Sequence, residues 1–209
     1  MSDDDSDDDN GKAKFEAERD KILSDLPQNL KDKFGEIGFV LVEDDGDDED
    51  DDEDKKVTPQ QPKEYYQPAL IVNPYEVPPK PVRDIYWFQL YQKAKRSKAK
   101  LAAMDYLVYI YGSDDADDCY NFVSQEEFLS LKDAQEQGLD KLPAELEEKK
   151  QSAGKLSDVE ATLVRGFEEM QHDINKEPTD RKPHSKFSFL ERHEQLAEGD
   201  GPPTKKQKS

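Results

Sequence analysis

Residues 82–112 read VRDIYWFQLYQKAKRSKAKLAAMDYLVYIYG and lie at the centre of the apolar part of the chain, which runs from Ala69 to Leu131. On either side of the basic run 93–100, apolar residues recur at helical spacing: Ile85, Phe88 and Tyr91 before it, and Leu101, Met104, Leu107, Val108 and Tyr111 after it. Gly112 follows the second group, where a glycine commonly ends a helix. The spacing therefore predicts two helices that meet near Ser97.

The last part of this stretch has a second interpretation. Five of the six residues 106–111 are aromatic or β-branched, which favours a strand. Periodicity alone does not separate a helix from a strand over so short an apolar run. We favour the helix and predict a mostly α fold, with an α+β arrangement of a few short strands as the alternative.

Composition limits the folded part to a small central domain. Only 33% of the 209 residues are hydrophobic, against roughly 45–50% in a typical globular chain. The formal net charge of −20 divides into −17 over residues 1–54, +6 over 55–111 and −9 over 112–209. These shifts predict seven regions: a disordered acidic tail (1–14), an amphipathic helical arm with an apolar end (15–42), an acidic tract and Pro/Gln-rich linker (43–67), a central folded domain (68–138), a charged linker or short helix (139–156), an amphipathic helix (157–175) and a disordered polar tail (176–209).

Two serines carry the spacing of a helix capping box, in which a serine is followed three residues later by a glutamate. Ser124 with Glu127 predicts a helix that ends at Gly138. Ser157 with Glu160 predicts a helix through about residue 175, with a narrow apolar seam formed by Val159, Leu163, Phe167, Met170 and Ile174. Such a seam suits docking, either on the parent domain or on a partner.

The strongest feature of the sequence is an acidic tract in which every residue from Glu43 to Asp54 except Gly46 is Asp or Glu. Like charges in such a block repel one another, so the block stays extended and solvated. We interpret it as a polyanionic ligand that shields basic proteins such as histones or ribosomal proteins; a solubilising linker is the alternative. The predicted partner-binding residues are Glu43, Asp44, Asp45, Asp47, Asp48, Glu49, Asp50, Asp51, Asp52, Glu53 and Asp54, with Tyr65 and Tyr66.

Apolar residues flank the tract on both sides. Residues 38–42 read as a short strand or an extended apolar anchor, and Tyr65 and Tyr66 follow the tract. Charge alone steers a partner with little specificity. We therefore expect these apolar residues to anchor the partner.

A basic cluster predicts an alternative function. Cationic side chains in a row bind phosphate backbones, and the cluster consists of Lys93, Lys95, Arg96, Lys98 and Lys100. The alternative is thus a nucleic-acid-binding module that the acidic tracts autoinhibit. A chain of net charge −20 repels DNA at long range, so a solvated helix face, or an intramolecular partner of the tracts, is the other interpretation of the cluster.

The C-terminus, GPPTKKQKS, matches a nuclear import pattern. Lys205, Lys206 and Lys208 form K-K-x-K in a terminal tail after two prolines, where an import receptor has access to them. Solubilising lysines are the simpler interpretation. With the acidic surroundings, the pattern favours a nuclear protein.

No motif in the sequence indicates an enzyme. The G-x-S-x-G, P-loop and dinucleotide fingerprints are missing, the three histidines lack zinc spacing, and the acidic loop 114–118 lacks the glycine and terminal glutamate of an EF-hand. No run approaches the ~20 apolar residues of a membrane helix, and the single cysteine, Cys119, allows no internal disulfide. We expect a non-enzymatic nuclear protein without cofactor or metal, of the histone-chaperone, chromatin or pre-ribosome assembly type.

Overall fold

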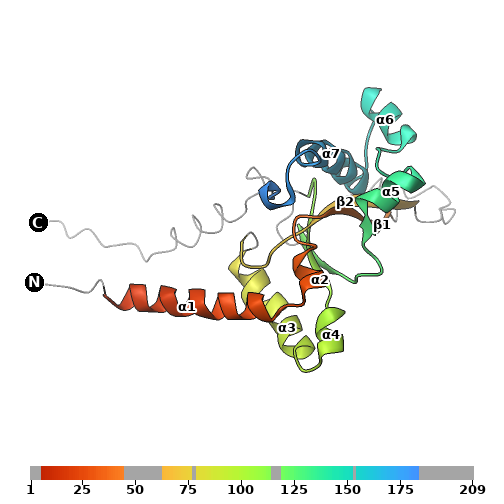
Figure 1. Ribbon diagram of the computed structural model, residues 1–209. Helices are drawn as coiled ribbons and strands as arrows, with labels where there is room; N and C mark the ends of the chain where they lie inside the picture. Colours follow the sequence, from red (N-terminus) through yellow and green to blue (C-terminus); the bar gives the residue numbers. More distant parts are fainter. Residues whose placement is uncertain (1–5, 45–62, 77–78, 114–118, 153, 184–209) are drawn as a thin grey trace, which may run out of the picture.

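The computed structural model describes residues 6–44, 63–76, 79–113, 119–152 and 154–183, with side chains from Ala13 onward (Figure 1). In this part of the chain, five strands form one antiparallel sheet in the order β4-β3-β2-β1-β5. The strands are β1 (Ile37–Asp44), β2 (Lys63–Ile71), β3 (Tyr106–Ile110), β4 (Tyr120–Val123) and β5 (Leu129–Ser130). The fold is therefore α+β, and our prediction of a mostly α fold is wrong.

The error lies in residues 106–111. Between Ser97 and Gly112, the only helix is α4 (Lys98–Ala102), and the chain then enters β3. β3 pairs with β2 on one side and β4 on the other, and Tyr106, Leu107, Val108 and Tyr109 are all buried. A strand buried on both faces has a continuous apolar sequence rather than an alternating one. That is why spacing alone did not distinguish it from a buried helix.

β1 and β2 form a long hairpin. Their register runs from Ile37 opposite Leu70 to Asp44 opposite Lys63. Phe39, Ala69 and Leu70 have no exposed surface, so the hairpin supplies the centre of the core. Residues 45–62, which connect Asp44 to Lys63, lie outside the described residues and contain most of the acidic tract. The tract therefore leaves and re-enters the fold at one end of the hairpin.

Helices surround the sheet (Figure 1). In Figure 1, α7 lies beside β1 and β2, α5 and α6 lie near the same side, and α1 extends away from the body toward the N-terminus, on the side of α3 and α4. The remaining elements are α1 (Ser6–Asp25), α2 (Gln28–Lys31), the π-helical turn η1 (Val82–Trp87), α3 (Phe88–Ala94), α5 (Leu131–Gln137), α6 (Ala144–Gln151), α7 (Asp158–Asp173) and the 3₁₀ turn η2 (Pro178–Asp180).

The two capping-box predictions have different outcomes. At α7 the prediction is confirmed, because Ser157 accepts from the backbone N–H of Glu160 and the Glu160 side chain accepts from that of Ser157. Ser124 and Glu127 exchange the same kinds of hydrogen bond, but they form a turn. The helix that follows, α5, begins at Leu131, and its N-cap is Ser130 rather than Ser124. It ends at Gly138 as predicted.

The predicted apolar seam of α7 docks on its own sheet. Leu163, Phe167 and Met170 are buried, and the ring of Phe167 lies 5.9 Å from that of Phe39 on β1. Gly166 allows this close approach, because a Cβ there would lie 2.7 Å from the carbonyl oxygen of Tyr111. The seam is therefore occupied by the parent domain.

Candidate functional site

The structure places the first two residues of the acidic tract at the end of the hairpin. Glu43 is exposed and Asp44 is 9% exposed. The Ser157 hydroxyl at the start of α7 donates a 2.9 Å hydrogen bond to the Asp44 carboxylate. The other predicted tract residues, Asp45 to Asp54, lie outside the described residues. The base of the tract is thus fixed to α7 as well as to β2.

Tyr65, predicted as a partner anchor, lies inside the fold. Its side chain is 5% exposed, and its hydroxyl donates to Glu145 on α6 at 3.3 Å and to Glu160 on α7 at 3.4 Å. Burial, reinforced by these two carboxylates, raises the pKa of Tyr65. Tyr66 is half-buried. The ring of Tyr65 therefore joins β2 to two helices and leaves little surface for a partner.

Glu160 is the centre of the contacts beneath the tract. Its carboxylate accepts from Lys149 at 2.8 Å and from the Ser157 backbone N–H at 3.1 Å. Burial alone would raise the pKa of Glu160, but the hydrogen bonds from Lys149 and Ser157 favour the charged form and lower the pKa below its ordinary value. Through these contacts α6, α7 and β2 form a base at the end of the β1–β2 hairpin, where the described chain stops at Asp44 and resumes at Lys63.

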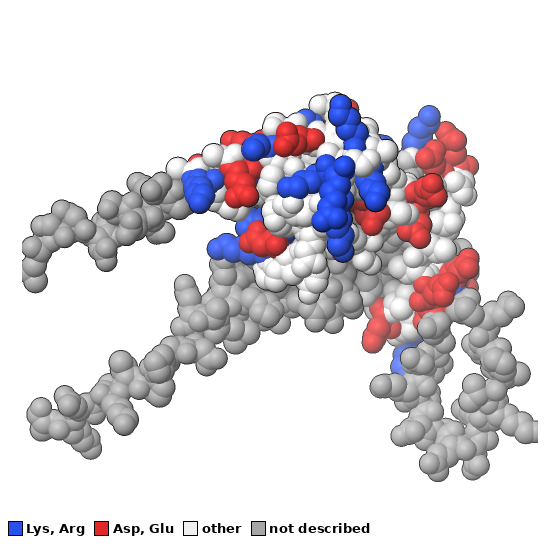
Figure 2. All heavy atoms as spheres, turned by 90° about the horizontal axis from the view of Figure 1, so that it is seen from below, with Lys and Arg blue, Asp and Glu red and all other residues white. Residues whose placement is uncertain are grey.

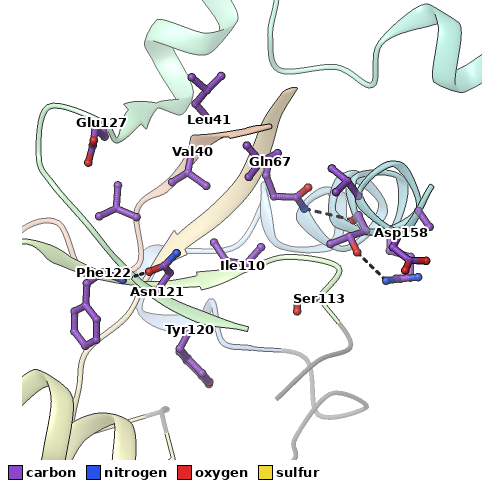
Figure 3. Close-up of a pocket in the computed structure, with 16 residues that line it drawn as sticks. Val40, Leu41, Gln67, Ile110, Ser113, Tyr120, Asn121, Phe122, Glu127 and Asp158 are labelled. Carbon is purple, nitrogen blue, oxygen red and sulfur yellow. Dashed lines mark hydrogen bonds between the residues drawn. The ribbon is translucent and has the colours of Figure 1, made fainter. Parts of the chain in front are cut away.

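A groove of about 960 Å³ opens across the sheet beside this base (Figure 3). In Figure 3, Val40, Gln67, Ile110 and Asn121 form its floor, with α7 along one side. Leu41 also lines the groove, and 47% of its surface is exposed. Strands β1 to β4 and the first half of α7 thus build one open depression whose lining is apolar in part and polar in part.

Two carboxylates stand at the groove. Figure 3 shows Glu127 and Asp158 on opposite sides of it. Neither is paired with a Lys or Arg of the described residues, whereas Arg165, which also lines the groove, donates to the carbonyl oxygen of Gly112 at 2.8 Å and to the hydroxyl of Thr162 at 3.1 Å. The rim therefore offers negative charge to a ligand.

The predicted basic cluster forms a second, separate surface. Figure 2 shows Lys and Arg gathered on the face that carries α3 and α4. All five predicted residues are exposed: Lys93, Lys95, Arg96, Lys98 and Lys100. The Lys95 ammonium lies 5.5 Å from the Tyr91 ring, and none of the five pairs with a carboxylate of the described part. Tyr86, in the preceding turn, is 59% exposed.

Three further predictions concern nuclear import, metal binding and Cys119. Lys205, Lys206 and Lys208 lie outside the described residues. Where the structure describes the chain, no group of three or more His, Cys, Asp and Glu is arranged to hold a metal, and Cys119 is buried. No helix in the same part has the length and apolar character needed to cross a membrane.

Comparison with known proteins adds no relative: no protein-family model, no curated protein and no solved structure matches the chain. Function must therefore be inferred from the chain's own residues.

The groove is the feature that sequence reasoning missed. Its lining comes from residues 40–42, 110, 113, 120–123 and from 158–165, together with Gln67 and Glu127. A firm strand assignment for residues 37–44 would have placed Val40 and Val42 on one face of the sheet and Leu41 on the other. No signal in the sequence relates that strand to Glu127 or Asp158.

Proposed function

We propose that this protein is a non-enzymatic, acidic nuclear protein that binds histones, ribosomal proteins or similarly basic partners through the acidic tract 43–54. One observation supports the proposal above the others. Asp44 and Lys63 are opposed at the end of the β1–β2 hairpin, so the tract-bearing segment is attached to the fold at both ends.

The surface around the hairpin end extends the negative charge of the tract. Glu43 and Glu64 are opposed there and exposed, and exposed Glu145 accepts a hydrogen bond from Tyr65 of the same hairpin. Charge of one sign raises the local concentration of an oppositely charged partner and speeds its association. In this mechanism the tract attracts a cationic partner and competes with nucleic acid for it.

The experiment measures the affinity of the full chain for purified core histones as a function of salt. A tract variant replaces six aspartates by asparagine: Asp47, Asp48, Asp50, Asp51, Asp52 and Asp54. A matched control makes the same change at the six aspartates between Asp3 and Asp9. We expect the tract variant to bind about tenfold more weakly at low salt, with a smaller loss near 0.5 M salt because salt screens exposed charges.

The control variant separates position from total charge. Both variants carry six fewer negative charges, so equal losses would show that only net charge matters and would contradict a tract-specific site. Unchanged binding of the tract variant would contradict the proposed function altogether.

A second candidate function is nucleic-acid binding on the α3–α4 face. The observation in its favour is that Lys93, Lys95, Arg96, Lys98 and Lys100 are all exposed and unpaired with carboxylates of the described residues. An exposed aromatic gives a base a surface for stacking, and Tyr86, in the turn that precedes α3, is 59% exposed. Nuclear import through Lys205, Lys206 and Lys208 stays a prediction.

A further inference from the structure

We infer that the groove formed by β1 to β4 and α7 binds an apolar side chain of the basic partner, on an extended segment whose neighbouring lysines or arginines pair with Glu127 and Asp158. The inference rests on the proposed function. It adds a requirement for an apolar residue between the partner's cations, which the tract alone does not select. Such a segment has the pattern cation–apolar–cation.

The apolar part of the groove lining suits one apolar side chain. Leu41 keeps 47% of its surface exposed, although β1, the strand that contains it, is paired with β2. Phe122 and Val159, from β4 and α7, are half-buried at the same depression. A volume of about 960 Å³ is at the upper end of the roughly 300–1,000 Å³ typical of ligand pockets, so the groove has room for a short peptide segment.

The charges at the rim select the sign of the partner. Asp158 is the first residue of α7 and Glu127 lies in the turn before β5, on the other side of the groove. Both lack a cationic partner among the described residues, while Arg165 is occupied by Gly112 and Thr162. A segment with a cation on each side of its apolar residue complements this arrangement, whereas an acidic segment would meet two like charges.

The groove is continuous with the acidic tract. Val42 lines the groove, and the next residue, Glu43, begins the tract. A partner held by the tract is therefore delivered to the groove. Because Tyr65 is buried and engaged with Glu145 and Glu160, the apolar contact that gives specificity comes from the groove rather than from this tyrosine.

The test uses the full chain and two labelled peptides of equal positive charge, Lys-Lys-Leu-Lys-Lys and Lys-Lys-Ser-Lys-Lys, each in the same Gly/Ser frame. Burying a leucine side chain predicts that the wild-type chain binds the leucine peptide about tenfold more tightly. Ala161→Phe places a ring in the groove from α7 and should abolish this preference. Gln171→Phe adds the same ring at an exposed site of α7 outside the groove and should keep it.

A second variant protects the test against loss of folding. Leu41→Thr removes the exposed leucine while keeping a residue that favours a strand, and it should reduce the preference for the leucine peptide. If Ala161→Phe, folded by circular dichroism, and Leu41→Thr both keep the full preference, the groove is not the site. The six-aspartate tract variant separates the two proposals. It should weaken the binding of both peptides by the same factor, and unchanged binding would contradict the proposed role of the tract. The preference for the leucine peptide measures the groove in either case.

Discussion

Glu160 shows how one buried carboxylate joins three elements. It is 3% exposed, and it accepts hydrogen bonds from Lys149 on α6, from the N-cap of α7 and from Tyr65 on β2. A buried ionised group is tolerated only when it is paired and hydrogen-bonded. At this residue, the sequence motif of a capping box therefore acts as a tertiary contact as well as a helix start.

The first prediction concerns Glu160→Gln. It removes the charge that pairs with Lys149 and should lower the free energy of unfolding at pH 7 by about 1–3 kcal/mol. Glu168→Gln is the matched control on the same helix, because the ion pair of Glu168 with Lys150 is exposed and should contribute less than about 0.5 kcal/mol. Urea unfolding of the three proteins measures both values, and equal losses would contradict the role assigned to Glu160.

The same pair of variants predicts a pH dependence. The folded-state pKa of Glu160 is lowered, so its contribution to stability is complete above the unfolded-state value of about 4.3 and is lost as the pH falls through the folded-state pKa. The difference in unfolding free energy between wild type and Glu160→Gln should therefore shrink below about pH 4. A difference that stays constant to pH 3 would contradict the lowered pKa.

At the scale of elements, α1 packs on the fold with its second half. Ile22 and Leu26 are buried, and Leu26 borders a cavity of about 20 Å³ with Trp87 and Met104. Phe15, two turns before Ile22, keeps 40% of its surface exposed; Arg83 lies 4.6 Å above its ring, and the ring of Tyr75 lies 6.3 Å away. The packing of this helix thus decreases from its C-terminal end toward its N-terminal end.

This gradient gives a prediction for two alanine substitutions, one in α1 and one at the residue that follows it. Leu26→Ala removes buried methyl groups and should cost about 2–4 kcal/mol of unfolding free energy. Phe15→Ala removes a larger but partly exposed side chain with one cation–π contact and should cost less than about 1 kcal/mol. Thermal and urea unfolding would measure both, and a larger cost for Phe15→Ala would contradict the packing of α1.

Elements also show where local patterns were sufficient. α7 follows from the spacing of Ser157, Glu160 and its apolar seam, because each signal lies within the helix itself. β3 does not follow from its own residues, because its conformation depends on β2 and β4, which are distant in sequence. Ser124 and Glu127 form the side-chain contacts of a cap without a helix, since the chain enters β5 directly afterwards.

At the scale of the whole molecule, opposite charges lie on different parts of the fold. The base of the acidic tract is held by α6 and α7, while the basic residues of α3 and α4 follow the other end of β2. In Figure 2, Lys and Arg gather at the centre of the view, while Asp and Glu lie at several places around them. Within the described residues the basic face is therefore available to a polyanion.

The second candidate function predicts measurable binding of a single-stranded oligonucleotide at low salt. Replacing Lys93, Arg96 and Lys98 by Gln should weaken binding at least about tenfold and reduce its dependence on salt. The same replacement of exposed Lys132, Lys141 and Lys155 is the charge-matched control and should have a much smaller effect. The six-aspartate tract variant should bind the oligonucleotide more tightly than wild type, because the tract repels the strand. Equal effects of the two triple variants would contradict a specific binding site on the α3–α4 face.

The sequence alone was sufficient for features that depend on neighbouring residues. The acidic tract, the basic cluster, the start of α7 and the stop at Gly138 are all readable because like charges, caps and glycine act over a few positions. For the candidate site, this gave the residues Glu43 to Asp54 and Lys93 to Lys100 as charged surfaces, but not their places in the fold.

Only the tertiary structure decided the fold class and the surroundings of the tract. Antiparallel pairing makes residues 106–110 a strand and turns the tract into the connection of a hairpin, and it buries Tyr65 while leaving Leu41 exposed. The groove exists because the sheet and α7 bring Leu41, Glu127 and Asp158 around one depression. Strand pairing and helix docking join residues far apart in sequence, so local spacing carries no information about which side chains they bring together or bury.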